Sequence, residues 1–250
     1  MTGRLHLGAI GFLLSALLMT ATGTRAETVA TSPKALERAI RDFITKYPQV
    51  IREALEKAEL DEQLANTKQV LKSQRDKIYG AGSPVLGKPD AKITIVEFYD
   101  YNCPYCRTVH GKLKDILKRH PDTRIVLKDI ATFGADSEAV GRIVLAAGRQ
   151  GKLPDLHEAL MAFKGKATEA TAIDFARRLD LDIDKLKKDA ALPEIAKQMK
   201  DAQALANELG VNGTPLFLIG HNGIPGAPDD LTEQIEKFLA DIRENGCEVC

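Results

Sequence analysis

The residues of this chain best suited to chemistry are its four cysteines, which form two C-x-x-C pairs, Cys103/Cys106 and Cys247/Cys250. Four cysteines are too few to staple a chain of 250 residues, so the interior must depend on ordinary hydrophobic burial. Two thiols at this spacing can form and break a disulfide bond without any metal or cofactor. The chemistry that the first pair predicts is therefore thiol–disulfide exchange.

The first pair lies where a run of strand-forming residues gives way to a run of helix-forming residues. If Cys103 caps the helix and Pro104 takes its first position, unpaired backbone N–H groups and the helix dipole favour a negative charge on the Cys103 sulfur. Cys106 lies one turn deeper on the same helix face, close enough to form a disulfide but shielded from solvent. We therefore predict that Cys103 attacks substrates and that Cys106 resolves the intermediate.

Two other interpretations of the cysteines have less support. A four-cysteine zinc site would have to join pairs that are roughly 140 residues apart, far beyond the spacing of zinc modules. A purely structural disulfide between Cys103 and Cys106 would close a very short loop and would remove little entropy from the unfolded chain. We predict neither a metal nor a cofactor at this pair.

Glu97 stands at the end of a largely apolar run, six positions before Cys103. A carboxylate partly buried beneath the dithiol would have a raised pKa and could exchange protons with Cys106; the alternative is a strand-end glutamate that faces water. Tyr105 lies between the cysteines and adds no charge, so it should lower the pKa of Cys103 less than a protonated histidine would, which favours a moderate oxidant. Three further residues are expected to frame the site: Asp100, Tyr101 and Arg107.

The segments around this pair predict an α/β domain. Lys92 to Phe98 has the branched and aromatic residues of a buried strand, Thr108 to His120 has the composition of a helix, and Thr123 to Ile130 that of a second strand. A strand–helix–strand unit implies that the two strands are parallel. The remaining expected elements are a helical insertion over about 136–209, a turn and strand over 211–219, a hairpin partner near 223–226 and a closing helix from Asp229 to Arg243.

The first residues have the composition of a secretory signal peptide. Residues 1–26 contain a basic start, an apolar run too short to span a bilayer and small residues ending at Ala26. Removal of Arg4 and Arg25 with this segment leaves 33 of the 35 basic residues against 35 acidic ones, so the composition predicts no basic surface for nucleic acid. We expect a protein that is exported, soluble after cleavage and located in the periplasm.

Residues 27–80 form a predicted helical segment. Apolar residues recur at spacings of three and four from Leu36 to Ala58, so one helix face needs a partner. This face could pack on the chain's own catalytic domain, or it could join copies of the chain as an N-terminal oligomerisation stalk. The sequence does not choose between these alternatives.

Gly213-Thr214-Pro215 is the last feature of note before the final strand. A proline can begin a strand, and because most X-Pro bonds are trans, the spacing alone favours a trans bond here. Together, "ITIVEFYDYNCPYC", an insertion beginning near "FGADSEAV", and "LGVNGTPLFLIG" resemble the thioredoxin-like thiol-disulfide oxidoreductases of the DsbA superfamily, from about Gly87 to Arg243. The stretch "FYDYNCPYC" after a helical segment looks most like the ScsC and Com1-like branch.

This resemblance implies a thioredoxin-like fold over about 81–243, in which the insertion forms a helical lid. It also implies a cis bond before Pro215, with Thr214 and Pro215 facing the dithiol and offering backbone groups that pair with an extended substrate peptide. Members of the ScsC branch use N-terminal segments to oligomerise. The sequence departs from the family in two places: "DIATFGADS" lacks a proline that relatives often carry, and the tail "CEVC" is not part of the family pattern.

The second cysteine pair follows a helix stop, Glu244-Asn245-Gly246, so residues 244–250 are expected to form a mobile tail. Cys247 and Cys250 could be a second redox pair, a site for a soft ion such as Cu(I), or an inert oxidised loop. The scattered histidines have no ligand spacing and are interpreted as structural or surface residues: His110, His120, His157 and His221.

The function that these observations favour is protein thiol–disulfide exchange, with disulfides formed or isomerised in substrate proteins that contain cysteines. Cys103, Cys106 and Glu97 are the predicted catalytic residues, and Thr214, Pro215 and Tyr105 the predicted substrate-binding residues. An unidentified redox partner would recycle the dithiol, and the chain could assemble into a trimer or dimer. The alternative function is a copper-binding or copper-handling thiol protein of the cell envelope.

Overall fold

The computed structural model describes residues 32–80 and 82–250. The predicted signal peptide, residues 1–26, lies outside this part of the chain. The contacts divide the chain into two units, residues 1–57 and 58–250, and each is described by itself. Across the described ranges, none of the helices combines the length and apolar character that crossing a membrane requires.

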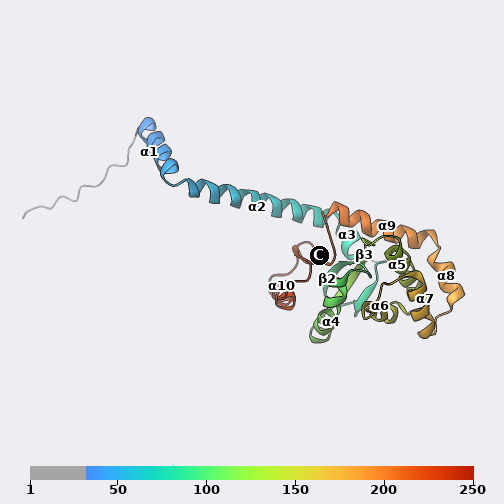
Figure 1. The fold of residues 1–250 in the computed structure, drawn as a ribbon. Helices are drawn as coiled ribbons and strands as arrows, with labels where there is room; N and C mark the ends of the chain where they lie inside the picture. The colour runs from blue at the N-terminus through green and yellow to red at the C-terminus, as the bar shows by residue number, and fades with distance from the viewer. Residues whose placement is uncertain (1–31, 81) are drawn as a thin grey trace, which may run out of the picture. The chain divides into compact units, whose positions relative to one another are not determined.

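Helices make up the described part of the first unit (Figure 1). Helix α1 (Pro33–Lys46) begins as the sequence predicts: the hydroxyl of Ser32 accepts a hydrogen bond from the backbone N–H of Ala35, and Pro33 takes the first helical position. Helix α2 (Pro48–Ser73) starts at the second proline after the break at Tyr47 and continues into the second unit. Its last turns are followed by the short α3 (Arg75–Tyr79).

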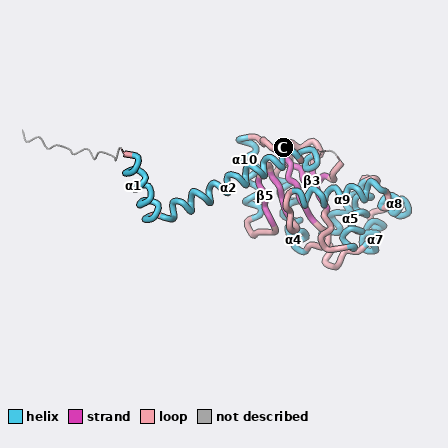
Figure 2. The backbone as a smooth tube through the Cα atoms, turned by 90° about the horizontal axis from the view of Figure 1, so that it is seen from above, coloured by secondary structure: helices cyan, strands magenta, loops and turns pink. Residues whose placement is uncertain are grey.

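The second unit is built on a five-stranded mixed sheet with the order β1-β3-β2-β4-β5 (Figure 2). The central strands β2 (Ile93–Tyr99) and β3 (Thr123–Asp129) are parallel and are joined by α4 (Pro104–Arg119), which is the predicted βαβ unit. All other strand pairs are antiparallel. The remaining strands are β1 (Val85–Gly87), β4 (Leu216–Ile219) and β5 (Asn222–Pro225).

The helical insertion lies between β3 and β4, where the sequence places it. Its helices are α5 (Ala135–Gly148), α6 (Leu153–Met161), α7 (Glu169–Arg178), α8 (Ile183–Ala190) and α9 (Pro193–Glu208). The closing helix α10 (Leu231–Asn245) follows β5. The mixed sheet with its helical insertion confirms the predicted α/β, thioredoxin-like class.

Two hydrophobic cores cover the two faces of the sheet. Because side chains alternate along a strand, Ile95 and Tyr99 of β2 point into the larger core with α4, α5, α6 and α10. Val96 and Phe98 point into the smaller core with α3, α9 and the end of α2. Every residue of β2 is buried, as its run of branched and aromatic residues predicts.

The C-terminal residues also belong to the smaller core. Val249 is fully buried there, packed with Leu71 of α2 and Ile78 of α3, so the segment that was expected to be a mobile end is docked on the second unit. The label C, which marks the C-terminus, lies beside the end of α2 in both Figure 1 and Figure 2. The sequence did not predict this docking because a single apolar residue between two cysteines carries no periodicity.

Candidate functional site

Cys103 stands at the junction of a loop and α4. Its backbone is extended, Pro104 takes the first helical position, and its carbonyl accepts the N–H of Arg107, so Cys103 is the N-cap residue. The hydrogen bond from the Cys106 thiol lowers the pKa of Cys103 to about 6, and the backbone N–H groups of Tyr105 and Cys106 act in the same direction. The neighbouring thiol, more than the helix terminus, therefore stabilises the Cys103 thiolate.

Cys106 is fully buried on the inner face of α4. Its hydrogen bond to Cys103 and its burial raise the pKa of Cys106, and the charge of Glu97 acts in the same direction. Both cysteines are free thiols in this structure. The two sulfurs thus differ strongly in acidity, with Cys103 the better nucleophile.

The segment before β4 lies directly against this pair. The Thr214–Pro215 peptide bond is cis, as the family resemblance implies and contrary to the base rate for X-Pro bonds. The sulfur of Cys103 lies 3.2 Å from the carbonyl oxygen of Thr214. Pro215 is buried, whereas Asn212 and Gly213 are exposed. This arrangement leaves an exposed backbone segment next to the nucleophile.

Glu97 lies inside the protein, in β2. Its side chain is 1 % exposed, and its Oε2 atom has no hydrogen-bond partner within the described ranges. Burial, followed by the charge of Cys103, raises the pKa of Glu97 to about 8. A carboxyl group that is protonated near neutral pH and electrostatically coupled to both cysteines is placed to take up and return a proton.

Asp100 organises the loop between β2 and α4. Its carboxylate accepts hydrogen bonds from the backbone N–H of Asn102 at 2.6 Å, the backbone N–H of Phe133 at 2.9 Å and the hydroxyl of Ser137 at 2.7 Å. A weaker contact joins it to the Thr132 hydroxyl at 3.3 Å. Asp100 therefore ties the cysteine loop to the start of the helical insertion, which is a more specific role than the framing role expected from sequence.

Arg107 and Asn102 extend this connection. The guanidinium of Arg107 donates to the carbonyl oxygens of Tyr101 at 2.7 Å and Gly165 at 2.6 Å. The amide of Asn102 donates to the carbonyl of Ala167 at 3.0 Å and accepts from its N–H at 2.8 Å. The sequence gives no sign of this role for Asn102, because its partners Ser137 and Ala167 are 35 and 65 residues away.

A buried row of polar rings lies behind the site. The hydroxyl of Tyr99 donates to that of Tyr101 at 3.1 Å, and the Tyr101 hydroxyl lies 2.9 Å from Nδ1 of His157 in α6. Burial, with a contribution from His110, lowers the pKa of His157 to about 3, so this imidazole is neutral. His157 fits the structural role expected for it, but its hydrogen bond to the loop was not foreseen.

The other predicted site residues divide into two groups. Tyr105 is 64 % exposed on α4, between the two cysteines, where a substrate could touch it. Cys247 and Cys250 lie elsewhere, at the far end of β4 near Gly220, and they form a disulfide with each other. Sulfurs joined in a disulfide offer no thiolate to copper, and no group of three or more metal-binding side chains occurs in the part of the chain that the structure describes.

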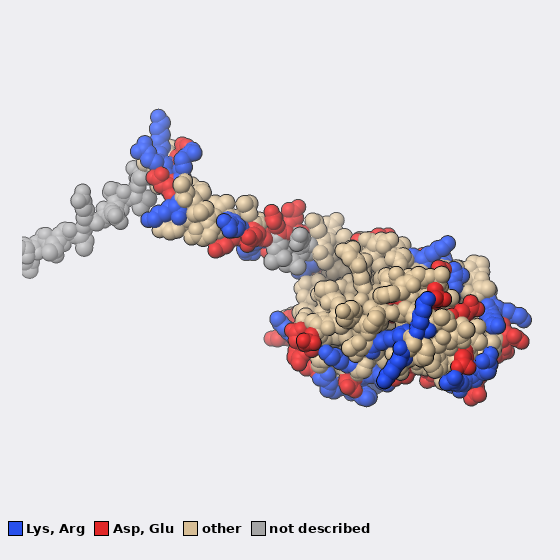
Figure 3. Space-filling view, in the orientation of Figure 1, with Lys and Arg blue, Asp and Glu red and all other residues tan. Residues whose placement is uncertain are grey.

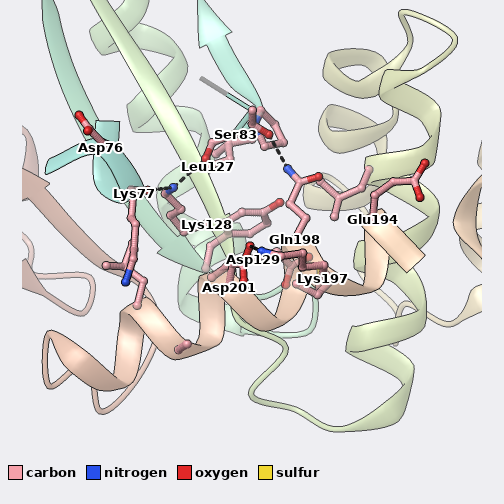
Figure 4. A pocket seen from close by; sticks show the side chains of 18 residues that line it. Asp76, Lys77, Ser83, Leu127, Lys128, Asp129, Glu194, Lys197, Gln198 and Asp201 are labelled. Carbon is pink, nitrogen blue, oxygen red and sulfur yellow. Dashed lines mark hydrogen bonds and ion pairs between the residues drawn. The ribbon is translucent and has the colours of Figure 1, made fainter. Parts of the chain in front are cut away.

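A cavity of about 490 Å³ lies at the edge of the sheet, between β3, α3 and α9. Neither Cys103 nor Cys106 lines it. In Figure 4 the amine of Lys128 reaches toward Ser83, to which it donates a hydrogen bond at 2.7 Å. Burial lowers the pKa of Lys128 to about 8. Burial raises the pKa of the neighbouring Asp129 well above its usual range. The cavity is separate from the dithiol.

Comparison with known proteins agrees with this geometry. A family model described as the DSBA-like thioredoxin domain matches residues 94–239. A thioredoxin-like oxidoreductase from Silicibacter pomeroyi DSS-3 is 36 % identical, with a TM-score of 0.65, over 68 % of this chain and 98 % of its own. A linker-deletion mutant of ScsC from Proteus mirabilis is 27 % identical, with a TM-score of 0.65, over 88 % of this chain and 99 % of its own.

Two curated relatives are similar to this chain over different shares of their own length. Disulfide bond formation protein D of Bacillus subtilis (strain 168) is 26 % identical over 174 residues, which are 63 % of this chain and 78 % of that protein. The chain spans only about a fifth of the length of a Na(+)/H(+) antiporter NhaA 1 from Salinispora arenicola, which is 29 % identical over 147 residues (56 % of this chain, 22 % of that protein). With the dithiol, the cis proline and the family model in agreement, the chain belongs to the DSBA-like thioredoxin domain family.

Proposed function

We propose that this protein is exported to the periplasm, where it forms or isomerises disulfides in substrate proteins. The observation that carries the proposal is the Cys103 sulfur, which is acidic and lies beside the exposed backbone before Pro215. Its pKa of about 6 makes the thiolate the main form at neutral pH, and the thiolate is the attacking species in disulfide exchange.

The exchange proceeds through a mixed disulfide. In the reduced enzyme, the Cys103 thiolate attacks one sulfur of a substrate disulfide and releases the other sulfur as a thiolate. Glu97 gives its own proton to the departing substrate thiolate and, as a carboxylate, accepts the proton of Cys106. The Cys106 thiolate attacks the Cys103 sulfur, which releases the substrate and leaves a Cys103–Cys106 disulfide. Net oxidation of a substrate is this sequence in reverse, with the proton returned from Glu97 to Cys106. A redox partner that exchanges two electrons with the dithiol recycles the enzyme.

Substrate peptides would bind beside the nucleophile. The exposed backbone at Asn212 and Gly213 can pair with an extended peptide, while the exposed ring of Tyr105, in the first turn of α4, can supply an apolar contact. Cys103 itself is only 1 % exposed, so a substrate must displace neighbouring atoms to reach its sulfur. The carbonyl oxygen of Thr214, 3.2 Å from that sulfur, is one of the groups that cover it.

The face of the second unit in Figure 3 suits a protein substrate better than a nucleic acid. On the face shown in Figure 3, positive and negative side chains are interspersed over the second unit, and a broad uncharged area lies between them. Nucleic-acid binding requires a concentrated positive surface, because the phosphate backbone supplies most of the affinity.

Self-association through the first unit is part of this proposal. Large apolar side chains of α1, the break and the start of α2 are between 37 % and 58 % exposed, which leaves an apolar face of the first unit uncovered: Leu36, Ile40, Phe43, Ile44, Tyr47, Val50, Ile51 and Leu55. A second or third copy of the same helices would cover this face, giving a dimer or trimer. Several dithiols in one particle would favour isomerisation, whereas a monomer kept oxidised would favour net disulfide formation.

Trapping tests the catalytic proposal directly. In C106S, the mixed disulfide at Cys103 cannot be resolved, so incubation with a scrambled, disulfide-containing test protein should give a covalent complex that reductant releases. C103S is the matched control and should trap nothing. If C106S traps no substrate although its Cys103 is alkylated normally, the proposed mechanism is wrong. The rates with reduced and with scrambled test protein separate an oxidase from an isomerase.

A further inference from the structure

The second C-x-x-C pair forms a compact loop that is held on the second unit. Cys247 and Cys250 are joined in a disulfide, and both are partly exposed. Between them, Val249 is fully buried in the smaller core with Leu71 of α2 and Ile78 of α3. One apolar side chain, presented by the disulfide loop, therefore connects the C-terminus to the helices that precede the sheet.

Polar contacts around Val249 involve the same helices. Glu248 forms ion pairs with Lys72 and, at 3.8 Å, with Lys68, both on α2. The guanidinium of Arg75 donates to the carbonyl oxygen of Cys250. Because these pairs are solvent-exposed, they orient the loop but contribute little free energy of their own. The loop depends mainly on the position of Val249.

The disulfide fixes that position. The backbone N–H of Cys250 lies 3.1 Å from the sulfur of Cys247, so the loop is closed by a covalent bond and by a hydrogen bond across the same short segment. The Cys247 sulfur also lies over Gly220, where a Cβ atom would be 3.5 Å away. Opening the disulfide gives residues 247–250 more conformational freedom, and ordering them again costs conformational entropy.

The two cysteine pairs lie at opposite ends of β4. Thr214 and Pro215 precede the strand and face Cys103, whereas Gly220 follows the strand and faces Cys247. Five residue steps from Pro215 to Gly220 correspond to roughly 16 Å in an extended strand, too far for one sulfur to attack the other. Exchange at the second pair thus requires a thiol from another molecule.

We propose that Cys247–Cys250 is a second redox couple, and that its reduction releases the C-terminal loop from α2 and α3. The reaction partner is a protein dithiol. One thiolate of that dithiol attacks a sulfur of the loop, and the second displaces the mixed disulfide. Two electrons pass to the loop, which becomes two thiols, and the partner becomes a disulfide. Release of Val249 exposes Leu71 and Ile78 and weakens the packing of the last turns of α2 around Leu71.

Hydrogen exchange on the full chain tests this proposal. In C103S/C106S, the only cysteines left are those of the loop, so dithiothreitol acts there alone. We expect reduction to speed amide exchange of peptides covering 68–79 and 246–250 about tenfold or more, while β2 and β3 stay protected. Equal exchange in the oxidised and reduced protein would overturn the proposal, as would a disulfide that resists dithiothreitol until the protein unfolds.

Two further variants separate redox release from a general loss of packing. C247S/C250S should exchange as fast in these peptides as the reduced protein, and it should keep wild-type catalytic activity at Cys103. V249A removes the buried contact but keeps the disulfide, so its exchange should be fast with or without dithiothreitol. If the reduced C103S/C106S protein and C247S/C250S both retain the slow exchange of the oxidised loop, the disulfide does not hold the loop and the release model is wrong.

Discussion

The carbonyl oxygen of Thr214 lies 3.2 Å from the sulfur of Cys103, across 111 residues of sequence. The two residues come from separate halves of the domain: Cys103 begins the helix after β2, and Thr214 precedes β4, which pairs with β2. Because β4 and β2 are hydrogen-bonded neighbours, the sheet itself holds the backbone before Pro215 beside the Cys103 sulfur. The catalysis that we propose at Cys103 therefore depends on the pairing of these strands.

Replacing Glu97 should change both catalysis and the pH dependence of stability. With its pKa raised to about 8, native Glu97 keeps a proton that it loses at its ordinary value of 4.5 in the unfolded chain. The stability linked to this proton is present below that value and is lost as the pH rises through about 8. E97Q, which does not titrate, should therefore gain stability relative to wild type between these pH values, and should resolve mixed disulfides more slowly.

Denaturant unfolding of the reduced protein at several pH values measures the first effect, and single-turnover release of a trapped substrate measures the second. The matched control is E244Q, at an exposed position near the end of α10, which should unfold in parallel with wild type. Parallel curves for E97Q and wild type would show that Glu97 does not hold a proton in the native protein.

Loss of the Asp100 carboxylate should destabilise the loop between β2 and α4. In D100A, the N–H groups of Asn102 and Phe133 and the hydroxyl of Ser137 lose their acceptor inside the protein, at a cost of about 2–4 kcal/mol. D229A, at an exposed site, is the control. Urea unfolding gives the values, and a D100A protein as stable as D229A would mean that water replaces the carboxylate without cost.

Tyr101 and Tyr105 offer a matched pair of hydroxyl deletions. Y101F removes the group that joins Tyr99 to Nδ1 of His157, leaving two buried polar atoms without partners, and should cost about 1–3 kcal/mol. Y105F removes a hydroxyl from an exposed ring and should leave the free energy of unfolding nearly unchanged. Equal thermal midpoints for the two variants would contradict a stabilising role for the buried row.

A charge placed on the apolar face of the first unit should prevent self-association. Phe43 is 51 % exposed on α1, so F43D costs little in an isolated chain but would bury a carboxylate if copies packed through this face. We expect light scattering to report a smaller particle for F43D than for wild type. E37Q, on the same helix, should keep the wild-type mass. An unchanged mass for F43D would remove the dimer or trimer from the proposal.

Local patterns predict the elements of this fold well. The Cys103–Pro104 start of α4, the Ser32–Pro33 start of α1 and the apolar run of β2 each follow from propensities that a short window contains. The parallel pair β2 and β3 also follows, because only a crossover helix separates the strands.

Features that depend on distant partners could not be predicted in the same way. Nothing near Asp100 indicates that Phe133 and Ser137 will donate to it, and nothing near Val249 indicates that a core lies within reach of the tail. The cis bond before Pro215 came from the family resemblance, since the base rate alone favours trans. Tertiary contacts decide these features, and a single sequence does not contain them in local form.

Titration of the ultraviolet absorbance of Cys103 in the purified, reduced protein tests most directly whether this sulfur is a thiolate at neutral pH. With C103S as the blank, we predict one ionisation with a midpoint near pH 6, well below the ordinary pKa of 9.0 for a cysteine. A midpoint close to that ordinary value would rule out the proposed attack, because the sulfur would then be a neutral thiol under the conditions in which it must react.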